Sequence, residues 1–157
     1  MIPCDRADSH LFPISANMSC FARANNITVA FELYDLKYCD RTTDEHCPAD
    51  GRYQYNTELV LSDDGSVIAR YYKTHEWYPL KAAIDEPVDQ PLIKYTTSFG
   101  VQFGIFMCFD IMWPSPAKDL VEDGVRHFTY SVAVRLLGFV LFSVLLCRFG
   151  AFCRFSF

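Results

Sequence analysis

The chain has 157 residues, of which 51% are hydrophobic and 21% charged, and this composition is typical of a single domain with a packed core. The formal net charge is −5, and Lys and Arg form no basic stripe. A nucleic-acid partner is therefore excluded, because binding to a phosphate backbone depends on clustered cations.

The first third of the chain predicts one helix, one strand and one loop. Apolar residues at helical spacing over 14–25 predict a helix that stops at Asn25 and Asn26. The β-rich segment 27–33 predicts a strand. Residues 36–52 are polar and contain two cysteines, which indicates a loop.

The second third predicts a β-hairpin followed by a loop. Two β-rich runs, residues 53–62 and 66–73, flank the turn sequence Asp-Asp-Gly. Residues 74–90 carry two prolines and many charges, and we expect them to lack regular structure.

Residues 91–133 predict two strands, a short helix and a further strand. Residues 91–97 and 101–111 predict strands. Residues 115–124 predict a short helix with Ser115 as its N-cap, Pro116 in its first turn and Gly124 at its end. Residues 125–133 predict a further strand. This succession indicates an α/β fold.

The seven cysteines favour an oxidised protein. Cys39 and Cys47 flank a polar loop that a disulfide could close, and the other disulfide candidates are Cys4 and Cys20. Free thiols are the alternative. A zinc site at Cys39, His46 and Cys47 is disfavoured, because the paired C-x-x-C spacing of structural zinc sites is missing.

Glycosylation signals also indicate a secretory history. Asn17 and Asn26 each begin an Asn-x-Ser/Thr sequence. The first ten residues have neither the basic start nor the apolar run of a signal peptide. We therefore expect the front of the protein to be missing from this sequence.

The composition changes at Val134. Residues 134–157 contain no Asp, Glu, Asn, Gln or Pro. Only 12 residues, 136–147, separate Arg135 from Arg148, whereas a membrane helix needs about 20 apolar residues. We therefore expect no stable membrane association, although a small membrane-associated protein held by 136–147 is the weakest of the alternatives.

Cys108 lies at the C-terminal end of an apolar strand, where α/β enzymes expose nucleophiles. A buried structural cysteine is the alternative from the residues alone. The segments "DGRYQYNTELVLSDDGSVIARYYK", "FGIFMCFDI" and "PAKDLVEDGVRHFTYSVA" resemble the nitrilase (carbon–nitrogen hydrolase) superfamily, in particular its biotinidase/vanin branch. The resemblance covers residues 2–133.

The resemblance implies about half of an α-β-β-α sandwich, over residues 1–133, followed by an unrelated apolar tail over 134–157. It also implies a Glu–Lys–Cys triad. Cys108 would be the nucleophile and Lys73 would stabilise the oxyanion, with the backbone N–H of Phe109 as a second oxyanion donor. The general-base glutamate would lie upstream of the matched residues, and it is absent from this chain. No cofactor or metal is implied.

Two further positions depart from the family pattern. Lys81 stands where many members carry a second glutamate, while Glu76 and Glu86 are nearby but out of register. The strand that ends at Ala133 lacks the Pro-Thr-Ala-Trp ending of the family. Because a splice-donor sequence read in frame encodes Val followed by Arg or Ser, we interpret 134–157 as translated intron, with a genuine alternative C-terminus as the rival interpretation.

The resulting hypothesis is a fragment of a secreted or externally anchored amidase. The complete protein would hydrolyse a linear amide of the biotin-amide or pantetheine type through a cysteine thioester. Because the base is missing, we expect this chain alone to be inactive. A non-catalytic truncated or decoy binding form is the alternative.

Overall fold

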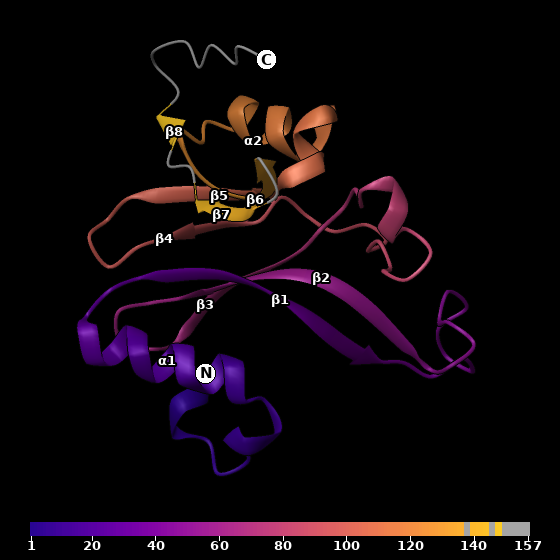
Figure 1. Cartoon of the computed structure of the whole chain (residues 1–157), viewed down its shortest axis with the longest axis horizontal. Helices are drawn as coiled ribbons and strands as arrows, with labels where there is room; N and C mark the ends of the chain where they lie inside the picture. The colour runs from indigo at the N-terminus through magenta and orange to yellow at the C-terminus, as the bar shows by residue number, and fades with distance from the viewer. Residues whose placement is uncertain (137–138, 145–146, 149–157) are drawn as a thin grey trace.

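Two β-sheets lie face to face between two helices in the computed structural model of the chain (Figure 1). The structure describes residues 1–136, 139–144 and 147–148, with side chains described up to residue 132. The α-β-β-α order expected from the sequence is therefore confirmed. The main elements are α1 (Pro13–Asn25), β1 (Val29–Tyr38), β2 (Arg52–Leu61), β3 (Val67–Tyr72), β4 (Lys94–Thr96), β5 (Gln102–Met107), α2 (Asp119–Glu122), β6 (His127–Leu136), β7 (Phe139–Val144) and β8 (Cys147–Arg148).

The two sheets differ in how their strands are paired. The first sheet has the order β1-β2-β3 and is antiparallel throughout. The second has the order β4-β5-β6-β7, with β8 also paired to β6. Within it β5 and β6 are parallel and are joined through α2, as the predicted strand–helix–strand succession requires.

Alternating side chains along the strands produce three apolar clusters that hold the four layers together. On β5, Ile105 faces the first sheet while its neighbour Phe106 faces α2. The cluster between the sheets consists of Val60, Ala69, Tyr71, Tyr95, Phe103, Ile105 and Met107. A second cluster joins Phe106, Val125 and Phe128 to Leu120 of α2. The third joins Ala22 of α1 to Leu59 and Leu61 of β2.

Helix α1 is fixed to the hairpin turn by a buried hydroxyl group. The Ser19 hydroxyl donates to the Gly65 carbonyl oxygen at 2.6 Å and accepts the Cys4 N–H at 3.2 Å. Gly65 has φ +82, and a Cβ atom there would lie 2.7 Å from the Ser19 carbonyl oxygen. The predicted Asp-Asp-Gly hairpin is confirmed, and its glycine is required both by φ and by the close approach of the helix.

The structure corrects several predicted boundaries. Strand β1 extends to Tyr38, five residues beyond the predicted strand 27–33, and shortens the predicted loop 36–52. Strand β4 covers only Lys94–Thr96 of the predicted strand 91–97. Strand β5 ends at Met107, before the predicted end at residue 111, because the chain turns at Cys108 into a 3-10 helix, Cys108–Met112.

The predicted helix 115–124 is also partly wrong. Ser115 is extended, with φ −96 and ψ 139, and lies inside a π-type turn, Pro114–Lys118, which is followed by the four-residue helix α2. An extended backbone is usual both before proline and at an N-cap, but the regular helix begins only at Asp119, so Ser115 is not its N-cap. Gly124 does end the helix, with φ +89.

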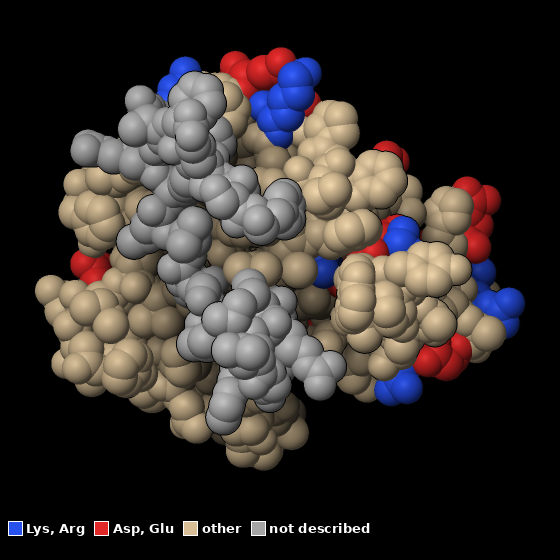
Figure 2. Space-filling view, turned by 45° about the horizontal axis from the view of Figure 1, so that its top comes forward, with Lys and Arg blue, Asp and Glu red and all other residues tan. Residues whose placement is uncertain are grey.

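The strand expected to end at residue 133 continues as β6 to Leu136, and β7 and β8 follow it. Residues 137–138, 145–146 and 149–157 of the predicted tail lie outside the described residues. Among the residues that are described, no helix is long and apolar enough to cross a membrane. On the visible face of the described part, Lys and Arg are scattered among Asp and Glu (Figure 2).

We predict that Gly104→Ala destabilises the contact between β5 and α2. An added Cβ would lie 3.0 Å from both methyl carbons of Leu120 and 3.2 Å from Val125 Cγ1. Leu120 is fully buried, so relief requires backbone movement, and overpacking of this kind costs about 1–3 kcal/mol. Urea unfolding measures the loss.

The double variant Gly104→Ala/Leu120→Ala supplies the control for this prediction. If the clash is the cause, the double variant loses less stability than the sum of the two single variants. Strict additivity of the two losses would contradict it.

Candidate active site

Cys108 lies on a strained turn at the end of β5. Its φ of +42 places a non-glycine residue in the left-handed region, which is uncommon and is often found at functional sites. The side chain is partly exposed and is a free thiol. The Tyr130 hydroxyl donates to the Cys108 carbonyl oxygen at 3.0 Å and so holds the turn against β6.

Lys73 follows β3 directly and belongs to the other sheet. Its N–H donates to the Asn56 carbonyl oxygen at 2.9 Å, which continues the pairing with β2. The side chain is only 3% exposed. Its ammonium Nζ lies 3.2 Å from Glu76 Oε2, so the buried cation has a buried counter-ion.

Glu76 is held by a second ion pair behind it. Its N–H donates to Glu86 Oε1 at 2.7 Å, and Lys81 Nζ lies 2.9 Å from the same oxygen. The other carboxylate oxygen, Glu76 Oε1, is buried and has no hydrogen-bond partner among the described residues. In the family pattern the second glutamate aligns with Lys81 and not with Glu76, so the resemblance did not point to Glu76. Its position three residues after Lys73 was the signal in the sequence for this contact.

Asp110 connects the turn of Cys108 to the segment that follows Lys73. Its buried carboxylate accepts the Met107 N–H at 2.8 Å within the turn. From the other sheet it accepts the Tyr71 hydroxyl at 2.7 Å, the His75 N–H at 2.9 Å and the Thr74 hydroxyl at 3.1 Å. Burial and the Asp110 charge raise the pKa of Tyr71, which therefore remains a donor.

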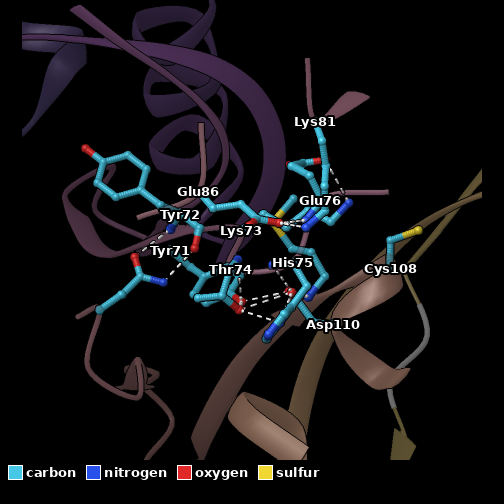
Figure 3. Close-up of polar contacts among 12 residues, drawn as sticks. Tyr71, Tyr72, Lys73, Thr74, His75, Glu76, Lys81, Glu86, Cys108 and Asp110 are labelled. Atoms are coloured by element: carbon cyan, nitrogen blue, oxygen red, sulfur yellow. Dashed lines mark hydrogen bonds and ion pairs between the residues drawn. The ribbon is translucent and has the colours of Figure 1, made fainter. Parts of the chain in front are cut away.

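Figure 3 shows this arrangement, with the contacts of Asp110 on one side and those of Lys73 and Glu76 on the other. Cys108 lies beside them with its sulfur pointing away from Asp110. No hydrogen bond joins Lys73 to Cys108 within the described side chains. Asp110 therefore brings their backbone segments together without putting the two side chains in contact.

Two further carboxyl groups lie between the sheets, and sequence reasoning missed both. Glu32 of β1 and Glu58 of β2 are directly opposite in the strand register. Glu58 is fully buried and accepts the Ser131 hydroxyl at 2.7 Å. Burial raises the pKa of Glu58 to about 7 and also raises the pKa of Glu32, against the opposing effect of Lys73. The sequence carries no signal for this pair, because its placement depends on the register of β1 and β2.

The predicted disulfide and glycosylation residues lie away from this centre, whereas Phe109 belongs to it. Disulfides join Cys4 to Cys20, between the N-terminal turn and α1, and Cys39 to Cys47, across the loop between β1 and β2. Asn17 is exposed on α1, and Asn26 is exposed at the end of that helix in a left-handed conformation. Phe109 is partly buried within the 3-10 turn after Cys108.

Aromatic side chains border the two connected segments. The His75 ring stacks on Trp113 with centroids 4.8 Å apart. The exposed apolar residues of the same two segments are Trp77, Tyr78, Ile111, Met112 and Trp113. The candidate site is therefore bordered by apolar surface as well as by charges.

We predict that Asp110→Asn separates the two segments. Each carboxylate oxygen of Asp110 accepts at least two hydrogen bonds, so an amide in either orientation turns its NH₂ toward donors. The expected loss of stability is about 3 kcal/mol, the order for leaving buried groups unpaired, and urea unfolding measures it. The matched control is Asp50→Asn at an exposed aspartate. Equal stability of the two variants would contradict the importance of the Asp110 contacts.

The carbon–nitrogen hydrolase family model matches residues 3–139. Human pantetheinase is 40% identical over 123 residues, which cover 78% of this chain and 23% of that protein. Biotinidase of Takifugu rubripes is 38% identical over 117 residues, covering 74% of this chain and 23% of that protein. The chain thus spans about a quarter of the length of these relatives.

Solved structures share the fold at lower sequence identity. A carbon–nitrogen hydrolase from Helicobacter pylori G27 superposes with a TM-score of 0.63 at 22% identity, covering 82% of this chain and 40% of that one. An amidase from Nesterenkonia sp. gives a TM-score of 0.62 at 18% identity, covering 85% and 46%. Because the family model covers most of the sequence and the fold agrees, this chain belongs to the carbon–nitrogen hydrolase family.

Proposed function

We propose that residues 1–133 are part of an amidase domain in which Cys108 is the nucleophile and Lys73 stabilises the oxyanion. One observation carries this proposal. The fully buried Asp110 accepts hydrogen bonds from the turn of Cys108 and from the segment that follows Lys73. A lysine and a cysteine on different sheets are thereby kept at one edge of the sandwich.

The proposed reaction is acyl transfer through a thioester. The Cys108 thiolate forms a C–S bond to the amide carbonyl carbon, and the π electrons of the carbonyl move to oxygen. The Lys73 ammonium and the Phe109 N–H would stabilise this oxyanion. Collapse breaks the C–N bond, and the leaving nitrogen takes the proton that the thiol gave to the general base of the complete protein. Water then hydrolyses the thioester to the acid and the free thiol.

The general base is the missing component. By family resemblance it is a glutamate upstream of the residues matched here, and general-base assistance typically contributes about 10²–10⁴-fold. We therefore expect these 157 residues alone to give no useful turnover. A non-catalytic binding or decoy form is the second candidate, and it is favoured by the Lys73–Glu76 ion pair, which already engages the Lys73 ammonium in this chain.

We propose a linear amide of the pantetheine or biotin-amide type as the substrate of the complete protein. The support is the similarity to proteins named pantetheinase and biotinidase. The two disulfides support a secreted or externally anchored location, because disulfides persist in oxidising compartments. On the same grounds we propose glycosylation at the exposed Asn17 and Asn26.

We also keep the proposal that the domain ends near residue 133 and that 134–157 is translated intron. Sequencing of the full-length transcript outward from the codons of Cys108 tests it. The expected transcript leaves the present frame near Val134 and continues into further domain sequence. A transcript that runs in frame through Val134 and Arg135 to Phe157 would contradict the proposal.

Alkylation of Cys108 at several pH values tests the paired roles of Lys73 and Cys108. A nearby cation favours the thiolate, so Lys73→Met should slow the alkylation of Cys108 at neutral pH severalfold. Iodoacetamide is the probe, and mass spectrometry of the Cys108 peptide gives the rate. This readout does not depend on turnover.

Lys118→Met is the matched control, because Lys118 is exposed and pairs with Glu122 on α2. Identical alkylation profiles of the Lys73 and Lys118 variants would overturn the proposed role of Lys73. Turnover of pantetheine by the unmodified chain, abolished by Cys108→Ser, would overturn the expected inactivity while supporting the nucleophile.

A further inference from the structure

The ammonium group of Lys73 is paired with a buried carboxylate from the same segment of the chain. The side chain of Lys73 is 3% exposed, and that of Glu76 is fully buried. The distance from Lys73 Nζ to Glu76 Oε2 is 3.2 Å. A buried cation is costly unless a counter-ion accompanies it, so the place of the Glu76 carboxylate determines where the ammonium group can lie.

The other acidic side chains nearby do not provide this contact. Both carboxylate oxygens of Asp110 already accept hydrogen bonds from other groups. Glu58 accepts a hydroxyl group of β6. Glu32 interacts electrostatically with Lys73, but the two form no hydrogen bond within the described part of the chain. Glu76 is therefore the direct partner of the ammonium group in that part of the molecule.

Glu76 is itself held by the loop that carries it (Figure 3). Its N–H donates to Glu86 Oε1 at 2.7 Å, and Lys81 Nζ lies 2.9 Å from the same oxygen. The Glu86 carboxylate thus closes the loop 76–86 onto its own first residue. Lys81 stands where many members of the family carry a second glutamate, and here its charge holds the carboxylate that anchors Glu76.

The ion pair fixes Lys73 without using all of its hydrogen-bond donors. An ammonium group carries several N–H bonds, and among the described side chains only Glu76 accepts from it. The remaining N–H bonds lie where water is largely excluded. A hydrogen bond to a charged oxygen is stronger in such surroundings than in water, so an ammonium group held in this way is suited to a developing oxyanion.

We propose that Glu76 is the positioning residue of Lys73. It holds the ammonium group in one place, supported by the Lys81–Glu86 pair, and leaves N–H donors for a substrate oxygen. Glu76 acts on the reaction through Lys73. The use of the ammonium group in the reaction rests on the proposed function of Lys73 and Cys108, whereas its position rests on the contacts above.

Ammonium NMR of the full chain, labelled at lysine with ¹⁵N, tests the position of Lys73 directly. A buried and paired ammonium group is protected from exchange with water, so the Lys73 signal should be sharp, and its loss in Lys73→Met assigns it. Glu76→Gln should broaden this signal beyond detection. The matched control, Glu122→Gln at an exposed glutamate of α2, should leave it unchanged. A sharp Lys73 signal in a folded Glu76→Gln variant would overturn the proposal.

Lys81→Met is the second variant, and it carries the test if Glu76→Gln does not fold. The Lys81 side chain is exposed, and its loss removes only the outer ion pair with Glu86. The loop that carries Glu76 should then be less firmly closed, and the Lys73 signal should broaden while the chain stays folded. A Lys73 signal as sharp as that of the unmodified chain would count against the proposal.

Alkylation of Cys108 by iodoacetamide connects this position to the proposed function. Loss of the Glu76 charge by itself would favour the thiolate and speed the alkylation. Loss of the ammonium position acts in the opposite direction, so Glu76→Gln should slow the alkylation severalfold, and it should have no further effect in a chain that already carries Lys73→Met. Faster alkylation in Glu76→Gln would overturn the proposal, because Glu76 would then restrain Lys73 instead of positioning it.

The same two measurements separate this proposal from the proposed function. If Lys73→Met leaves the alkylation rate of Cys108 unchanged while Glu76→Gln still removes the Lys73 signal, the proposed function fails and the positioning of Lys73 stands. If Lys73→Met slows the alkylation but Glu76→Gln changes neither the signal nor the rate, the positioning role fails and the proposed function stands.

Discussion

The buried carboxylate of Asp110 is the contact on which the candidate site depends. The two sheets meet through apolar side chains, which resist separation but do not fix one exact alignment. Asp110 adds directional bonds, and its donors lie both in its own turn and 35–39 residues earlier in the chain. A side chain with two acceptor oxygens and four lone pairs is needed to satisfy these donors at once.

The charges at this edge follow from the same two-sheet construction. Lys73 and Glu32 leave the first sheet toward the second, and neither can reach bulk water freely. Each must find its partner inside the protein, as Lys73 does in Glu76. Ser131 of β6 reaches Glu58 across the interface.

The sequence predicted the architecture better than it predicted the contacts. Alternation and the Asp-Asp-Gly turn were enough for the hairpin, because both are local signals. The extension of β1 was missed because residues 36–38 were grouped with the polar, cysteine-containing segment that follows, although Tyr34, Leu36 and Tyr38 alternate with charges as in a strand. The start of the helix after Ser115 was misjudged because Pro114–Lys118 form a π-type turn, which the Ser-Pro signal does not distinguish from the first turn of an α-helix.

Family resemblance indicated Cys108 and Lys73 but not the groups around them. Glu76 has no counterpart in that register, and its contact with Lys73 depends on how the loop after β3 folds back. Glu32 and Glu58 could be placed opposite each other only once the strand register was known. For Asp110 the local contact with Met107 was foreseeable, while its partners on the other sheet were not.

The contact between Ser131 and Glu58 spans 73 residues of the chain. During synthesis, at about 5–20 residues per second, the β2–β3 hairpin emerges several seconds before β6 exists. Until β6 arrives, Glu58 faces solvent and is ionised at neutral pH. Docking of the second sheet then buries this group and raises its pKa to about 7. At neutral pH, which is close to this value, docking of β6 is therefore accompanied by partial uptake of a proton from solution.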